Sequence, residues 1–126
     1  MYLTYEEYLS YGGTVNEVEF TEIEFRARKY IDYLTDSRVD KMAEVPESVK
    51  LAMMAAIRFD GKYGTAALAD NSVLSSYSTD GYSESYGSAG EQQTAAKRSL
   101  NDSVRTLLYG ELDDKGVPLL YRGVYV

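Results

Sequence analysis

The chain has 126 residues and a formal net charge of −7, and it contains neither cysteine nor histidine. These two absences exclude disulfide bonds, thiolate chemistry and the side chain that most often serves as general base or transition-metal ligand. The negative charge argues against nucleic acid as a tightly held partner, because binding phosphates requires neutralising cations. The length fits one domain, residues 1–126. Because the chain has no apolar run of about 18 residues and no secretory signal, we expect cytosolic synthesis and no membrane partner.

The first segment predicts a short helix. Thr4 and Glu7 have the spacing of a capping box, in which each side chain bonds the other residue's backbone amide at the start of a helix. We expect this helix to cover residues 5–11 and to be closed by Gly12, since glycine readily adopts the left-handed conformation that ends many helices.

A second, longer helix is predicted from residue 17 to about residue 34. Asn16 and Glu19 form a looser capping box at its start. Apolar residues recur at steps of three and four and form one buried stripe: Phe20, Ile23, Ala27, Tyr30, Ile31 and Leu34. Glutamates and arginines four residues apart are expected to pair on a solvated outer face: Glu22 with Arg26 and Glu24 with Arg28.

Two further helices complete the predicted bundle. The third starts at Pro46 as its first helical residue and ends between Phe59 and Ala69, where glycines weaken it. The fourth has Ser88 as its cap and is stopped by Gly110. Its apolar stripe is Ala96, Leu100, Val104, Leu107 and Leu108. The predicted fold class is therefore mainly α, a small bundle of three main helices plus a short N-terminal helix.

Residues 71–87, rich in serine, tyrosine and glycine, do not fit the bundle. Asp80-Gly81 is a tight-turn dipeptide between two alternating runs, which predicts a long loop resembling a β-hairpin. An isolated hairpin is marginally stable in water, so it needs a surface to pack against. We expect assembly contacts from six of its residues: Tyr77, Asp80, Gly81, Tyr82, Glu84 and Tyr86.

Residues 111–126 form a tail that the sequence predicts to be extended. Proline and glycine argue against a helix, and apolar residues alternate as in a strand. So dense an apolar terminus has to dock on its own bundle or on a neighbour. We expect the neighbour to be contacted by Leu119, Leu120, Tyr121 and Arg122. The alternative for both the loop and the tail is that they cover only the core of their own protomer.

Motifs that would support chemistry are incomplete. Gly61-Lys62 resembles the end of a phosphate-binding loop, but Ala56 stands where the motif needs glycine and Tyr63 where it needs serine or threonine. Residues 113–116 lack the alternating ligands of a calcium loop and predict a plain turn. We expect no catalytic, cofactor-binding or metal-binding residues and no cofactor, so the chain is predicted not to be an enzyme.

Five segments occur in an order typical of one protein family: YLTYEEY (2–8) with GG (12–13), the helix over 20–34, VPESVK (45–50), DGYSESY (80–86) and LLYRGV (119–124). Through these segments, which span nearly the whole chain, the sequence resembles the head-tail connector (adaptor) family of long-tailed phages and Gram-positive prophages. The tyrosine- and serine-rich segment and the closing LLYRGV are the more specific pieces. The turn at residues 113–116, which contains two aspartates, departs from the family pattern by being longer.

The resemblance implies a structural virion protein made in the host bacterial cytoplasm. Such subunits form a ring of about a dozen copies through head-to-tail contacts. Its partners would be other copies of itself, the portal protein, and a tail-side connector or tail terminator protein. Double-stranded DNA would pass through the ring without tight binding. The competing interpretation is a small cytosolic interaction or regulatory module whose tyrosine-rich loop binds another protein.

Overall fold

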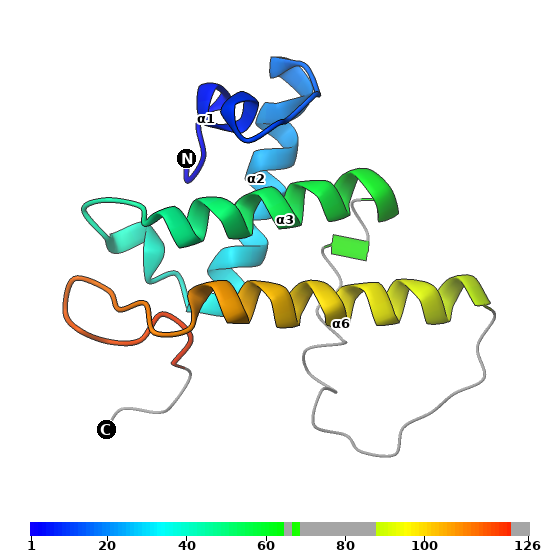
Figure 1. Ribbon diagram of the computed structural model, residues 1–126. Helices are drawn as coiled ribbons and strands as arrows, with labels where there is room; N and C mark the ends of the chain where they lie inside the picture. The colour runs from blue at the N-terminus through cyan, green and yellow to red at the C-terminus, as the bar shows by residue number, and fades with distance from the viewer. Residues whose placement is uncertain (65–66, 69–87, 122–126) are drawn as a thin grey trace, which may run out of the picture.

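The computed structural model describes residues 1–64, 67–68 and 88–121, with the backbone alone described for 88–93. Its elements, in chain order, are α1 (Tyr5–Ser10), α2 (Glu17–Thr35), the 3-10 helix η1 (Val39–Lys41), α3 (Glu47–Tyr63) and α6 (Ser88–Leu108). Figure 1 shows α3 and α6 side by side and antiparallel, with α2 crossing behind them and α1 at its N-terminal end. The prediction of a small helical bundle is confirmed.

The predicted capping box starts α1. The Thr4 hydroxyl accepts a hydrogen bond from the Glu7 amide at 3.1 Å, and the Thr4 amide donates to Glu7 Oε1 at 2.9 Å. The helix ends at Ser10, one residue before the predicted end, and Gly12 follows with a φ of +96°. The capping box and the glycine that follows the helix thus define both of its ends.

Tyr8 holds the loop that joins α1 to α2. Its hydroxyl accepts hydrogen bonds from the backbone amides of Thr14 and Val15, both at 3.0 Å. Its ring lies directly against Gly13, where an added Cβ would come within 2.3 Å of three ring atoms. Gly13 is required here because the ring occupies the space that any side chain would need.

The predicted outer face of α2 is partly wrong. Glu24 is completely buried; its Oε2 accepts a hydrogen bond from the Tyr2 amide at 2.9 Å, and its Oε1 lies 3.3 Å from an Arg28 nitrogen. Arg26 pairs with Asp60 of α3 at 2.9 and 3.2 Å. The Glu24 carboxylate therefore anchors the N-terminal segment to α2. It does lie close to Arg28, as predicted, but in a buried position and not on a solvated face.

The ends of α3 and α6 differ slightly from their predicted positions. Pro46 has an extended ψ of 154° and is the N-cap of α3, so it precedes the first helical residue. The helix ends at Tyr63, inside the predicted range. In α6, Ser88 is already helical, so it is not the residue that caps the helix. Assignments at helix ends commonly differ by one or two residues.

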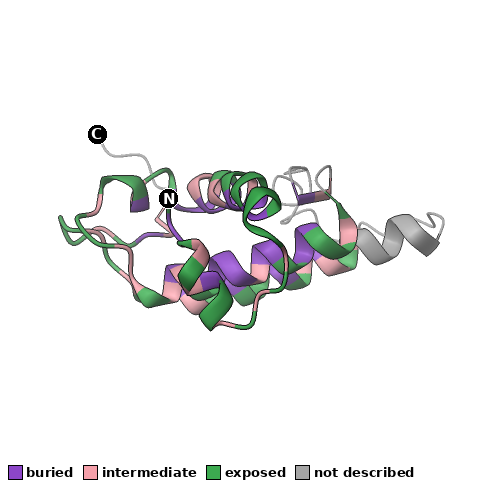
Figure 2. Cartoon of the chain, turned by 90° about the horizontal axis from the view of Figure 1, so that it is seen from above, coloured by how far each residue is buried: buried purple, intermediate pink, exposed green. Residues whose placement is uncertain are grey.

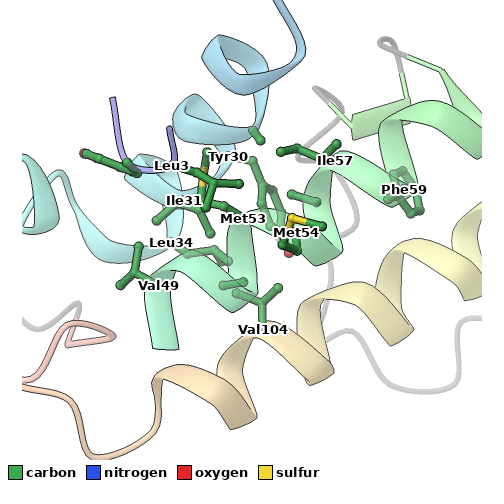
Figure 3. Close-up of a cluster of buried hydrophobic side chains, with 14 of the residues drawn as sticks. Leu3, Tyr30, Ile31, Leu34, Val49, Met53, Met54, Ile57, Phe59 and Val104 are labelled. Carbon is green, nitrogen blue, oxygen red and sulfur yellow. The ribbon is translucent and has the colours of Figure 1, made fainter. Parts of the chain in front are cut away.

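The core lies between α2, α3 and α6. Figure 3 shows side chains converging from α2 and α3 toward Val104 of α6, with Leu3 joining them from the segment before α1. Seen from above in Figure 2, the buried residues of each helix face its neighbours, and exposed residues cover the outside. A buried hydrogen bond of 2.6 Å, from the Tyr30 hydroxyl to Asn101 Oδ1, ties α2 to α6.

Two buried tyrosines make stability sensitive to alkali. Burial raises the pKa of Tyr30, which the nearby Arg105 partly offsets, and burial together with a hydrogen bond to Asp32 raises the pKa of Tyr2. In the unfolded chain both would ionise near pH 10, as tyrosine ordinarily does. Their stabilising contribution is therefore complete below about pH 10 and is lost as the pH rises further, because only the unfolded state then releases protons.

We expect the free energy of unfolding to fall between pH 8 and pH 11, and to fall less in the Tyr30→Phe variant. Urea titrations of both proteins at the two pH values measure this difference. Equal losses in the two proteins would contradict the role assigned to Tyr30.

Candidate functional site: a candidate assembly surface

No reaction centre is evident in the part of the chain that the structure describes. Among these residues, no group of three or more aspartates or glutamates is placed to hold a metal ion. No described helix is long and apolar enough to cross a membrane. The acidic side chains of α2 do not converge either: Glu24 is buried against Arg28, while Glu17, Glu19 and Glu22 are exposed. The features of the described surface that suit a function are those that could bind another protein.

Most of the predicted assembly residues lie outside the described part of the chain. These are Tyr77, Asp80, Gly81, Tyr82, Glu84 and Tyr86 of the predicted hairpin, and Arg122 of the tail. The structure describes the other three, Leu119, Leu120 and Tyr121, and brings them together beside the segment between α2 and α3.

The described part of the tail docks on its own protomer. Leu119 is completely buried in the core, and its amide donates to the Glu111 carbonyl at 2.9 Å. Arg38 donates from Nη1 to the carbonyl oxygens of Leu119, at 3.1 Å, and Tyr121. The chain's own core fully covers the Leu119 side chain, so contact of Leu119 with a neighbour stays a prediction that this protomer does not bear out by exposure. Leu120 and Tyr121 are half-buried.

Between α6 and the docked tail the chain forms a braced turn, residues 109–118, which we call the acidic turn. The Asp113 carboxylate accepts hydrogen bonds from the amides of Lys115 at 2.8 Å and Val117 at 2.9 Å, and these bonds lower its pKa. An antiparallel bridge joins Leu112 to Pro118. The predicted plain turn at 113–116 is thus confirmed.

Contacts with the first turn of α3 and with the segment before it hold the acidic turn in place. The Ser48 hydroxyl donates to Glu111 Oε2 at 2.8 Å, and the Ala43 amide donates to Asp114 Oδ2 at 2.8 Å. The turn nevertheless exposes two large apolar side chains, Tyr109 at 85% and Leu112 at 50%. A rigid backbone that presents apolar side chains to solvent has the form of a contact surface.

The outer side of α2 carries a second exposed apolar area. Val18 is 77% exposed and Phe25 is 50% exposed. Phe25 borders an open hollow of about 400 Å³, which we call the α2 hollow; it is lined by Met1, Thr21, Glu22, Glu24, Phe25, Arg26 and Arg28. Cations lie over the Phe25 ring, with Arg28 and Lys29 each 5.3 Å from its centroid.

The sequence held a signal for this area. Val18 and Phe25 are seven residues apart, two helical turns, and therefore share a face of α2. Neither belongs to the stripe that was assigned to the core. Apolar residues that share a helical face but lie off the buried stripe indicate a second contact face.

A buried lysine holds residues 67 and 68 against α6. Lys97 of α6 is 2% exposed, and its ammonium donates to the carbonyl oxygens of Ala67 at 2.9 Å and Leu68 at 2.6 Å. The rings of Tyr30 and Phe59 lie 5.4 and 5.8 Å away from it. Carbonyl and aromatic partners offset the cost of burying the charge. No pattern in the sequence distinguished Lys97 from a surface lysine.

Comparison of the chain with protein-family models, curated proteins and solved structures finds no match.

Proposed function

We propose that this chain is a structural subunit of a ring that joins the portal of a tailed phage to its tail, and that it acts by assembly and not by catalysis. In this role the ring would be built of about a dozen copies in head-to-tail contact and would form part of the DNA channel. Its partners would be further copies of itself, the portal protein and a tail-side connector or tail terminator protein.

One observation carries this proposal: the helical core is complete, yet two apolar areas stay exposed on the surface. The described part of the chain also has no evident reaction centre. The core is closed by α2, α3, α6 and the docked Leu119. Exposed apolar side chains nevertheless remain on α2, at Phe25, and on the acidic turn, at Leu112. The exposed areas support association with some protein. The order of sequence motifs, which resembles that of the head-tail connector family, is the reason for proposing a connector ring in particular.

The net charge supports passage of DNA without retention. With 20 acidic against 13 basic side chains, the protein carries a net negative charge that repels the phosphate backbone. Retention of double-stranded DNA at physiological salt would count against a channel role.

Association of the purified full-length chain tests the proposal. We expect concentration-dependent closed rings in electron microscopy and a matching mass by sedimentation, either with the chain alone or with an added phage portal protein. A chain that stays monomeric in both settings contradicts the proposal. A monomer that instead binds a cytosolic host protein one to one supports the alternative of a small interaction module.

A further inference from the structure

We propose that the acidic turn of one copy docks into the α2 hollow of a second copy. This inference rests on the proposed function and adds to it the two surfaces that make the contact between subunits. The occupant of the hollow is then the exposed side of residues 109–118, with Leu112 packed against Phe25.

The acidic turn has the properties of a preformed ligand. The Asp113 amide donates to the Val117 carbonyl at 2.8 Å, and the Asp113 carboxylate accepts two further backbone amides. The turn is also bonded to Ala43 and Ser48. A segment that is already ordered loses little conformational entropy on binding, so the burial of Leu112 translates more fully into affinity.

The α2 hollow offers complementary chemistry. One wall is the half-exposed ring of Phe25, and Arg28 and Lys29 lie over that ring. The acidic turn carries three carboxylates, Glu111, Asp113 and Asp114, against one lysine. The hollow itself carries both signs: Glu22 lines it and Arg28 pairs with Glu24, while Lys29 adds a positive charge beside the Phe25 ring. In a chain of net charge −7, copies repel one another, so the acidic segment meets least repulsion at this side of Phe25.

The two areas lie on different elements: the hollow is lined from the middle of α2, and the acidic turn belongs to the loop that follows α6, at the lower left of Figure 1. This favours a head-to-tail contact. A two-fold dimer that paired the acidic turn with itself would bring like charges together. Joining the turn of one copy to the hollow of the next covers both areas with a single kind of interface, and repetition of that interface builds a ring or a filament.

Single-cysteine variants test this contact, because the natural chain has no cysteine. Phe25→Cys and Leu112→Cys proteins are prepared separately, checked for native circular dichroism, mixed and treated with a short bis-maleimide crosslinker. We expect a crosslinked dimer in the mixture and little in either protein alone. The control mixes Leu112→Cys with Leu9→Cys, which places a thiol at an exposed apolar position of α1 outside both areas. This mixture should stay uncrosslinked.

The outcomes separate this inference from the proposed function. Rings that form without the Phe25–Leu112 crosslink overturn the inference and leave the ring proposal standing. A crosslink within the Phe25→Cys protein alone indicates that the α2 hollow pairs with the same hollow of a second copy, which also overturns the inference. The expected crosslink with open filaments supports the contact but contradicts a closed ring. A persistent monomer without any crosslink overturns both.

A second measurement uses the affinity itself. Replacing Phe25 with serine should raise the Kd for self-association roughly 30-fold, as expected when a central aromatic contact is lost. Lys29→Glu should weaken association most at low salt, where charge attraction is least screened. Unchanged association in both variants would show that the hollow is not the contact surface.

Discussion

Replacing Gly13 with alanine should destabilise the protein by about 3 kcal/mol or more. The new Cβ would overlap the Tyr8 ring, whose atoms lie 2.2–2.3 Å from that position. Tyr8 is itself buried between α1 and Phe20, so its ring cannot simply turn outward. Displacing the ring would also break the hydrogen bonds that its hydroxyl accepts from Thr14 and Val15. Urea denaturation of the variant and the natural protein measures the loss.

The matched control is the same substitution at Gly61. This glycine lies inside α3, is exposed, and has no atom within 4 Å of the position that a Cβ would take. Alanine favours the helical conformation there, so Gly61→Ala should stabilise the protein by about 0.5–1 kcal/mol. Opposite signs for the two substitutions would isolate the effect of the Tyr8 ring. A Gly13→Ala variant as stable as the natural protein would show that the ring has room to move.

Replacing Leu119 with alanine should cost about 2–5 kcal/mol, the range for truncating a fully buried leucine. Leu119 is completely buried, and the backbone on either side of it is held by Glu111 and Arg38. Deleting residues from 119 onward would therefore weaken the fold as well as any docking of the tail. A chain that ends after Tyr121 keeps the described contacts and is the better test of a role for the remaining tail.

Leu112 provides the comparison for Leu119. It is half-exposed on the acidic turn, so Leu112→Ala should change the free energy of unfolding by no more than about 0.5 kcal/mol. The same variant should associate more weakly if the turn is a contact surface. Chemical denaturation and sedimentation of both variants separate the two roles. Equal losses of stability for Leu112 and Leu119 would contradict the assignment of Leu119 alone to the core.

The helices were predictable because their signals are local. The capping box at Thr4, the cap at Asn16 and Gly110 after α6 act within a few residues of the backbone that they terminate. The apolar stripe of α2 likewise depends only on helical spacing. These parts of the sequence therefore determined the boundaries of the main helices to within a few residues.

The differences between the predicted and the observed surroundings concern residues whose partners lie far along the chain. Glu24 follows Phe20 by four residues and precedes Ala27 by three, so helical spacing alone places it on the buried stripe. Its charge favoured a position exposed to solvent, and helical spacing gives no sign of the hydrogen bond from the Tyr2 amide. Leu119 depends on Arg38, 81 residues earlier, which no local signal indicates. The candidate contact surface consists of the apolar side chains that such long-range contacts leave exposed, so local sequence patterns do not define it.

The docking of Leu119 also sets an order of events during synthesis. Of the described core residues it is the last to leave the ribosome, so the interior is incomplete until every helix has been made. The same step ties Leu119 to Glu111 and closes the Leu112–Pro118 bridge. A partly folded molecule would thus lack the rigid turn. If copies join through this turn as proposed, they would become able to associate only after their own folding is finished, and partly folded copies would be kept out of a growing assembly.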